Sequence, residues 1–296
     1  MDYKKVFKNQ ETRFKILRLM KFIPDKTMIS IQYKMKLGRT PNLISPERYT
    51  EKLQWYKLNY RTPLLTQASD KYAVREYIKS KGLEGILTKL YGVYKNPNEI
   101  ELKTLPEKFV MKTTNGSGTN YLCKNKAEFP INEIKESLNK WLKRDIYSSG
   151  REWCYKNIEP KIIVEEFLED NANQFDGIND YKFICFNGKP QYVVLDVDRH
   201  VKHKRNIYDL EWNLLEVSTD HSNIDRVIPK PMGLEKMIEV AETLSKDFPH
   251  VRVDLYWVNG KVYFGELTFY PWTGYVQFSP DEFDLVLGNK FSLPSI

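Results

Sequence analysis

Residues 251–268 read VRVDLYWVNGKVYFGELT, and this stretch predicts two strands joined by a turn at Asn259-Gly260. An Asn-Gly pair between apolar runs is a strong hairpin signal. Asp254 and Glu266 lie one on each strand, among apolar neighbours. Because an unpaired carboxylate is costly to bury, the two acids need a cation. That cation is either Mg²⁺, which prefers oxygen ligands, or the guanidinium of the nearby Arg252.

The register of this hairpin decides whether both acids lie on one face. A two-residue turn at Asn259-Gly260 in a regular ladder pairs Asp254 with Gly265, which places the two acids on opposite faces. A three-residue loop with Gly260 in the left-handed bulge position places both acids on the same face. The metal interpretation therefore requires an odd-length loop or a bulge.

Residues 109–123, FVMKTTNGSGTNYLC, predict a second hairpin with a small tip that contains two glycines. The tip at residues 115–118 offers backbone N–H groups with little side-chain bulk, which suits the binding of phosphate oxygens. Lys112 on the entering strand can place a positive charge beside the same phosphates. No Gly-Lys-Ser/Thr follows, so this is not a Walker A loop, and an ordinary hairpin tip is the alternative interpretation.

The rest of the chain alternates helices with paired strands. Strands are predicted at 87–93 and 161–168, and a hairpin at 181–186 and 191–196 that turns at Asn187-Gly188. Helices are predicted at 71–81, 131–143 and 234–246, the first capped by Ser69 or Asp70 and ended by Gly82. Residues 4–61 are mostly helical and basic, with breaks at prolines. Hairpins separated by helices indicate an α+β fold with antiparallel sheets.

Composition favours a folded protein of the cytoplasm. The chain has 296 residues, of which 41% are hydrophobic, and this length suffices for one large domain or two ordinary ones. No apolar run reaches the roughly 20 residues that span a bilayer, and residues 1–8 lack the apolar core of a signal peptide. The three cysteines have no framework spacing and no CxxC pattern, which favours reduced thiols.

The net charge of +7 predicts an anionic partner. Nucleic acid is not expected, because the sequence has no helix-turn-helix, zinc-finger or RNP-like segment. Residues 14–23, FKILRLMKFI, predict a basic amphipathic helix. Such a helix lies either on the inner face of the membrane, as a peripheral contact, or against the main domain with its lysines in water.

Five short segments, taken in order, carry a resemblance to a known family. They are EKLQW (51–55), DKYAVR (70–75), FVMK (109–112), DYKFICFNGKP (180–190) and VRVD (251–254). The chain resembles the ATP-grasp superfamily and, more narrowly, the TupA-like ATP-grasp proteins associated with teichuronopeptide and capsular polysaccharide synthesis. The resemblance runs from about Lys34 almost to the C-terminus.

The resemblance implies an ATP-grasp fold, in which two α+β subdomains with antiparallel sheets clasp ATP. A helical, basic N-terminal region at 1–68 would precede an ATP-grasp region at 69–296. Within the latter, about residues 105–168 would form the nucleotide lid and residues 169–290 the metal and catalytic subdomain.

The resemblance also implies a nucleotide site. Lys112 would contact the phosphates of ATP, and the loop of Asn115, Gly116, Ser117 and Gly118 would close over them. Glu165, Glu166 and Leu168 would line the adenine, the last two through backbone groups. Asp180 falls where the superfamily often has an acid that binds the ribose.

A metal and catalytic site is implied beside the nucleotide. Asp254 and Glu266 would hold Mg²⁺, and Thr268 stands where the superfamily often has an asparagine, which puts a second metal position in doubt. Arg252, Lys182 and Arg205 are implied to be catalytic through charge. For Arg205 a solvated basic loop is the alternative.

The activity implied is that of a carboxylate–amine ligase. ATP would phosphorylate a carboxylate to an acyl phosphate, and an amine would then attack it to give an amide, ADP and phosphate. The acceptor would be an anionic saccharide such as a uronic acid, or an amino-acid chain, and the amine an amino acid. The setting would be the synthesis of cell-surface polysaccharide.

Several alternatives remain open at the level of sequence. Asp196-Val197-Asp198 matches the Asp-x-Asp pattern of glycosyltransferases, which would release UDP rather than ADP. A phosphotransferase could use the same ATP site without forming an amide. A non-enzymatic protein that binds an anionic polymer would also explain the charge. His200 and His203 could bind a metal, although two such histidines in a basic loop more often lie in water.

Overall fold

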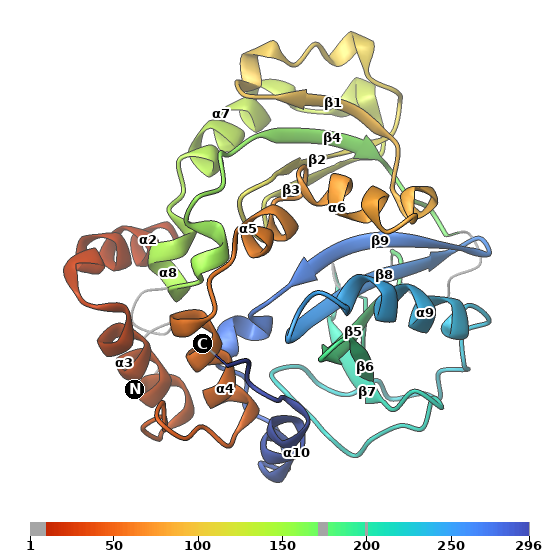
Figure 1. The fold of residues 1–296 in the computed structure, drawn as a ribbon. Coiled ribbons are helices and arrows are strands. Elements are labelled where there is room, and N and C mark those ends of the chain that lie inside the picture. The colour runs from red at the N-terminus through yellow and green to blue at the C-terminus, as the bar shows by residue number, and fades with distance from the viewer. Residues whose placement is uncertain (1–9, 171–176, 199–200, 296) are drawn as a thin grey trace.

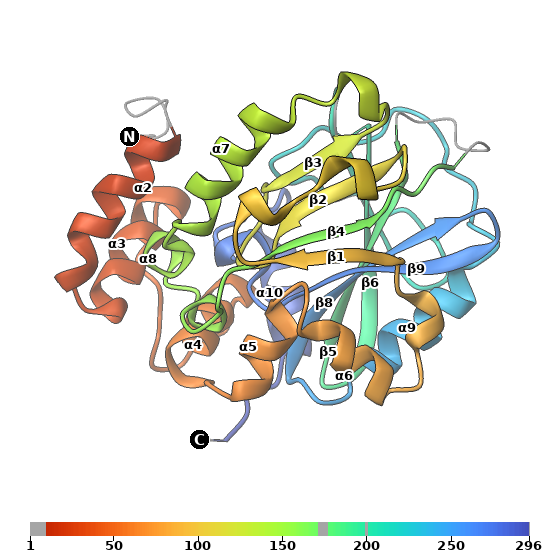
Figure 2. The same cartoon turned by 90° about the horizontal axis from the view of Figure 1, so that it is seen from above.

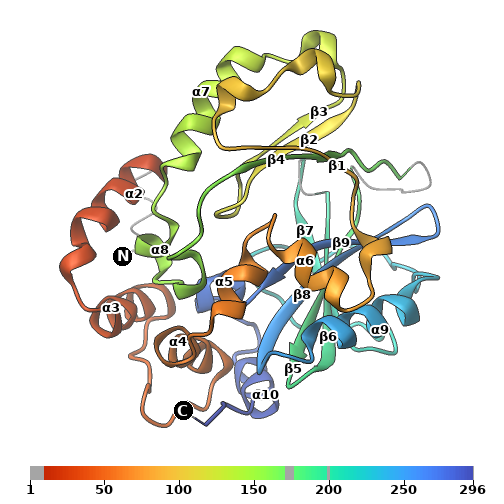
Figure 3. The ribbon, with the colours of Figure 1, turned by 45° about the horizontal axis from the view of Figure 1, so that its top comes forward.

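The computed structural model describes residues 10–170, 177–198 and 201–295. Two antiparallel sheets dominate it, one of four strands and one of five (Figure 1). The four-stranded sheet lies above the β8–β9 side of the five-stranded sheet, with helices α5 and α6 beside the space between them (Figures 1 and 3). The predicted α+β class with antiparallel sheets is confirmed.

Helices fill the N-terminal part of the chain. They are α2 (Gln10–Leu19), η1 (Met20–Phe22), α3 (Asp25–Leu37), α4 (Tyr49–Asn59), α5 (Pro63–Ser69) and α6 (Val74–Ser80). Seen from above, α2, α3 and α8 (Ile146–Gly150) form a group at one side of the molecule (Figure 2). No helix in the described ranges is long and apolar enough to cross a membrane.

The start predicted for the helix at 71–81 is wrong. Asp70 Oδ1 accepts hydrogen bonds from the N–H groups of Tyr72 and Ala73, at 2.8 and 3.1 Å. These bonds form a turn, so the helix begins at Val74. The helix ends at Ser80, close to the predicted end. Gly82, just beyond it, has a φ of +73°, which glycine adopts without strain.

The four-stranded sheet has the order β1-β4-β2-β3. Its strands are β1 (Leu90–Tyr94), β2 (Phe109–Thr113), β3 (Asn120–Cys123) and β4 (Ile162–Glu166). Helix α7 (Ile131–Leu142) packs on one face, where Ile134 and Leu138 share a core with Phe109 and Met111. The strand predicted at 87–93 begins later than predicted, at Leu90. Before it, the Thr88 carbonyl accepts a hydrogen bond from the Arg75 side chain at 2.8 Å rather than from a neighbouring strand.

The five-stranded sheet has the order β7-β6-β5-β8-β9. Its strands are β5 (Asp180–Phe186), β6 (Lys189–Val197), β7 (Lys204–Tyr208), β8 (His250–Val258) and β9 (Lys261–Thr268). Helix α9 (Leu234–Ser245) covers one face, and α10 (Glu282–Lys290) packs against α4. The opposite face of β8 and β9 turns toward the four-stranded sheet and carries the acids that the sequence singled out.

Candidate active site

The β8–β9 hairpin contains the bulge that the metal interpretation required. Asn259 and Gly260 form a two-residue turn with φ values of +49° and +78°, and Val258 pairs with Lys261. The ladder then shifts at Gly265, so that Asp254 pairs with Glu266. A Cβ atom at Gly265 would lie 2.9 Å from the Asp254 carbonyl oxygen, so glycine suits this position. The bulge therefore places both acids side by side.

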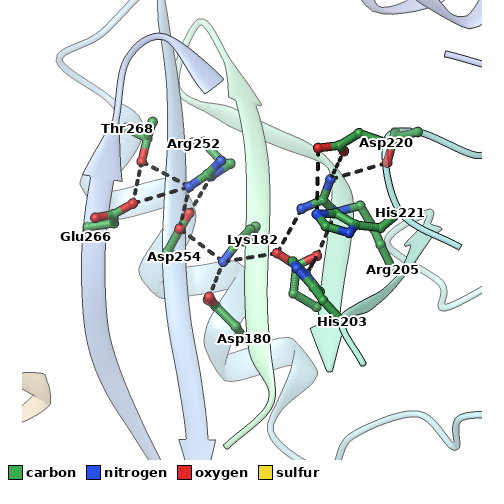
Figure 4. A network of polar contacts seen from close by, with 12 residues as sticks. Asp180, Lys182, His203, Arg205, Asp220, His221, Arg252, Asp254, Glu266 and Thr268 are labelled. Carbon is green, nitrogen blue, oxygen red and sulfur yellow. Dashed lines mark hydrogen bonds and ion pairs between the residues drawn. The ribbon is translucent and has the colours of Figure 1, made fainter. Parts of the chain in front are cut away.

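Arg252 lies between the two acids (Figure 4). Its Nε and Nη2 donate to the two carboxylate oxygens of Asp254 at 2.7 and 2.6 Å. Nη2 also reaches Glu266 Oε1 at 3.3 Å and Thr268 Oγ1 at 3.1 Å. The Thr268 hydroxyl in turn donates to Glu266 Oε1 at 3.0 Å. The arginine thus serves as the cation for both carboxylates in this conformation.

Glu266 is the more accessible acid, with 36% of its side chain exposed, whereas Asp254 is buried. Burial alone would raise the pKa of Glu266, but Lys71 and Arg252 lower it to about 2. Burial raises the pKa of Asp254, and Arg252 opposes that rise. Glu266 is therefore ionised at neutral pH and able to bind a cation.

Lys182 links this group to a second set of charges (Figure 4). Its ammonium pairs with Asp180, with Asp254 at 3.3 Å and with Asp196 at 3.6 Å. Beyond Asp196, Arg205 donates to that carboxylate at 2.6 Å and to Asp220 at 2.6 Å. Arg205 is thus joined to the Asp254 region only through intermediate side chains, and it lies on β7 at the edge of the sheet.

On the facing sheet, Lys112 projects from β2 and pairs with Glu165 of β4 at 2.9 Å. Arg75 of α6 binds the other oxygen of Glu165 at 3.0 Å. Although burial alone would raise it, Lys112 and then Arg75 hold the pKa of Glu165 below its usual range. The Glu165 side chain is therefore an ionised anchor that fixes Lys112 in place.

Lys71 connects the two sheets, and the sequence did not single it out as a site residue. Its ammonium donates to the Gly116 carbonyl in the predicted phosphate loop and lies 4.0 Å from Glu266 Oε2. Burial lowers the pKa of Lys71, and the nearby Glu266 opposes this effect. Both Lys71 and Arg75 belong to the DKYAVR segment, which was a signal for them.

Between the sheets lies a cavity of about 20 Å³. It is lined by Lys71, Arg75, Leu87, Thr88, Lys112, Glu165, Phe264 and Gly265. This volume holds about one water molecule and is too small for a nucleotide. The cavity brings Lys71, Arg75 and Lys112 close to Gly265, the residue before Glu266 on β9.

A profile of the TupA-like ATP-grasp family matches residues 51–292, which is most of the chain. The protein belongs to this family. Among curated proteins, none matches the chain.

Similar solved structures are ligases. D-alanine–D-alanine ligase from Bacillus anthracis has a TM-score of 0.45 and 17% identity, over 75% of this chain and 65% of that one. Phosphoribosylamine–glycine ligase from Thermotoga maritima has a TM-score of 0.42 and 16% identity, over 69% and 48%. The ATP-grasp ligase PsnB has a TM-score of 0.41 and 10% identity, over 85% and 67%. The chain thus spans less than two thirds of the length of the first two proteins.

The other nucleotide positions implied for an ATP-grasp protein lie at the ends of β4 and β5. Glu166 ends β4 and exchanges hydrogen bonds with Lys89, its N–H donating to the Lys89 carbonyl at 2.9 Å. Leu168 follows β4 and is half-buried. Asp180 begins β5 and is buried against Lys182. Binding of an adenosine ribose by Asp180 would therefore require its pairing with Lys182 to change.

The hairpin acids fit Mg²⁺ in part. Mg²⁺ is commonly held by one or two protein carboxylates together with substrate phosphates. Glu266 offers an ionised, accessible carboxylate, whereas both oxygens of Asp254 are bound by Arg252 and would become ligands once the guanidinium moves. In the described ranges no cluster of three or more His, Cys, Asp and Glu side chains forms a metal site.

Two sequence alternatives, the Asp-x-Asp pattern and the histidine metal site, find little support in the geometry. Asp196 of the Asp-x-Asp pattern is buried and its carboxylate is bound by Arg205. His203 lies 3.1 Å from Asp196, and His200 lies outside the described residues.

Proposed function

We propose that the protein is an ATP-dependent, Mg²⁺-requiring ligase that joins a carboxylate to an amine. The observation that carries this proposal is the juxtaposition of Lys71 and Lys112 with Glu266 across the space between the sheets. Cations on one side and an ionised carboxylate on the other suit a triphosphate whose charge is shared with a metal. Membership of the TupA-like ATP-grasp family supports this reading.

Each residue has a distinct part in this reaction. Lys112, held by Glu165, places a fixed charge on the phosphates. Lys71 joins the phosphate loop to Glu266, so that loop and hairpin close together. When bound at Glu266 and Asp254, Mg²⁺ would neutralise phosphate charge. Arg252, released from the two carboxylates, would stabilise negative charge on the transferred phosphoryl group.

The proposed reaction has two steps. A carboxylate oxygen attacks the γ-phosphorus, the bond to the bridging oxygen breaks, and ADP leaves. The amine then attacks the acyl carbon, and phosphate and a proton are released. The catalytic work is positioning and charge stabilisation, which explains why the site holds lysines and arginines.

The substrates we propose are an acidic saccharide or amino-acid chain as carboxylate, and an amino acid as amine, in the synthesis of cell-surface polysaccharide. A phosphotransferase is the second candidate, because it would use the same ATP site. Hydroxylamine separates the two, since it converts an acyl phosphate to a hydroxamate and leaves a phosphate ester unchanged.

Replacing Lys112 with alanine is expected to weaken Mg²⁺-ATP binding about ten- to a hundredfold. A hydrogen bond to a charged group contributes about 1.5–3 kcal/mol, and about 1.4 kcal/mol corresponds to tenfold in affinity. Calorimetric titration of the wild type and the variant measures this. Lys108→Ala is the matched control, because Lys108 pairs on the surface with Glu169. A folded wild type that does not bind ATP but binds a UDP-sugar would refute the ligase proposal.

We also propose that the N-terminal helical segment contacts the inner face of an anionic membrane. Leu19 and Phe22 are 77% and 85% exposed and lie beside the cations Arg18 and Lys21. Apolar side chains next to basic ones suit insertion between anionic headgroups.

A vesicle experiment tests this contact. The double variant Leu19→Ser/Phe22→Ser is expected to bind phosphatidylglycerol vesicles at least about tenfold more weakly than the wild type, because burial of each apolar side chain contributes about 1.5–3 kcal/mol. Ile44→Ser is the control, since Ile44 is 87% exposed outside this segment. Equal co-sedimentation of wild type and double variant would disprove the contact.

A further inference from the structure

A second, larger cavity lies on the other side of the phosphate loop. Its volume is about 210 Å³. Four stretches of the chain form it: Lys21 of η1, Asn115 of the loop, residues 144–147 at the start of α8, and residues 155–160 around the end of η6 (Trp153–Tyr155). A water molecule occupies about 30 Å³ in the liquid, so this volume has room for about seven waters, or for one sugar- or amino-acid-sized group.

The charge of this cavity is positive. Lys21, Arg144 and Lys156 contribute three cations against the one carboxylate of Asp145. That carboxylate is already engaged, because Oδ1 accepts the Ser148 N–H at 3.0 Å, Oδ2 accepts the Ser148 hydroxyl at 2.6 Å, and Oδ2 pairs with Lys21 at 3.5 Å. A ligand in the cavity therefore meets a net charge of about +2, which favours an anion.

The cavity wall is held in place by partly buried hydrogen bonds. The Tyr147 hydroxyl donates to Asp25 at 2.7 Å, and Arg151 donates to the Met20 carbonyl at 2.9 Å. These bonds fix η1, and with it Lys21, against α8, and α2 lies beside α8 in Figures 1 and 2. Lys21, Met20 and Asp25 all precede the segment 51–292 that matches the family. The N-terminal region thus supplies part of this wall.

The cavity is also linked to the proposed ATP site. Asn115 belongs to the loop whose Gly116 carbonyl is held by Lys71, and Lys71 reaches Glu266. An occupant would therefore lie beside the loop that closes over the phosphates.

From these observations we infer that this cavity binds the anionic co-substrate, a carboxylate-bearing molecule about the size of one sugar or amino acid. The three cations hold its negative charge, and Tyr147 and Tyr155 offer amphipathic ring surfaces to its less polar part. This inference rests on the proposed ligase function and specifies the place of its acceptor. A uronic acid and an acidic amino acid share the required chemistry.

Titration of the ATP-bound protein with D-glucuronate, L-glutamate and neutral D-glucose, followed by NMR, tests the assignment. One of the two acids is expected to bind, and glucose is not. The variants are Lys156→Gln and Lys21→Gln, both at exposed side chains. Each is expected to weaken binding of that acid about tenfold, because it removes a charged hydrogen-bond donor from the cavity. Lys103→Gln is the control, because Lys103 is 83% exposed and pairs with Glu101.

The outcomes separate this inference from the ligase proposal. Which acid binds identifies the class of carboxylate. Equal binding of that acid to the wild type and to both variants overturns the assignment of the cavity, while ATP binding and the ligase proposal stand. Failure of both acids to bind, or binding of glucose as tight as that of the acids, overturns it as well. Loss of ATP binding in the wild type would refute the proposed function instead.

Discussion

Replacing Glu266 with glutamine is expected to lower the rate of Mg²⁺-dependent ADP release about 10²–10³-fold at saturating ATP. Removal of one preorganised electrostatic group at a site of charge transfer has effects of this size. Glutamine keeps the shape and can accept the Thr268 hydrogen bond, but it removes the charge that faces Lys71 and Arg252. A coupled assay for ADP, with Mg²⁺ varied, measures the change and should show a raised Mg²⁺ requirement.

The control for Glu266→Gln is Glu235→Gln, because Glu235 pairs with Lys230 on the surface and lies in α9. This control is expected to retain wild-type turnover. If Glu266→Gln kept turnover within about threefold of the wild type, Glu266 would have no part in metal binding, and the Mg²⁺ site would have to be sought elsewhere.

The same variant carries a prediction about pH. The folded-state pKa of Glu266 is about 2, below its ordinary value of 4.5, so its ionised form stabilises the folded protein above pH 4.5. This contribution is lost as the pH falls from about 4.5 through about 2. Urea midpoints of the wild type and Glu266→Gln should therefore converge as the pH is lowered from 6 to 3. A difference that grew toward acid pH would contradict this assignment.

The sequence limited the hairpin to two registers but could not choose between them. The turn at Asn259-Gly260 was predictable from its residue types, and it has the left-handed φ values that this pair favours. The bulge depends on the fit of Gly265 beneath the Asp254 carbonyl, where a Cβ would approach to 2.9 Å. A glycine followed by an acid was visible in the sequence, but its contact with the opposite strand was not.

Residues that act across long sequence separations were the ones missed. Arg75 binds Glu165, which is 90 residues away, and Lys71 binds the carbonyl of Gly116, which is 45 residues away. Neither pairing follows from periodicity or local spacing, because both depend on how α6 and the turn before it pack beside the two sheets. The 210 Å³ cavity likewise combines Lys21 with Lys156, which no local pattern relates.

Replacing Lys182 with methionine is expected to reduce the free energy of unfolding at pH 7 by about 3–5 kcal/mol. Lys182 is only 4% exposed. Its ammonium pairs with Asp180, Asp196 and Asp254, all of which are buried. Removal of one partner from a buried ion pair costs about this much, since the remaining charge is left uncompensated. Urea denaturation of both proteins measures the change. Lys189→Met on the same hairpin, at an exposed position, should stay within about 0.5 kcal/mol.

The pH dependence of Lys182→Met distinguishes lost charge pairing from lost packing. Burial already raises the pKa of Asp254 above its ordinary value, with Arg252 and Lys182 opposing the rise, so loss of the ammonium raises this pKa further. At pH 5 the folded variant then binds more protons than the unfolded chain, so its stability increases as the pH falls from 7 to 5. Asp180→Asn in the same chain should restore part of the loss at pH 7. A deficit equal at both pH values, and not relieved by Asp180→Asn, would mean that Lys182 contributes through packing of its alkyl chain rather than through its charge.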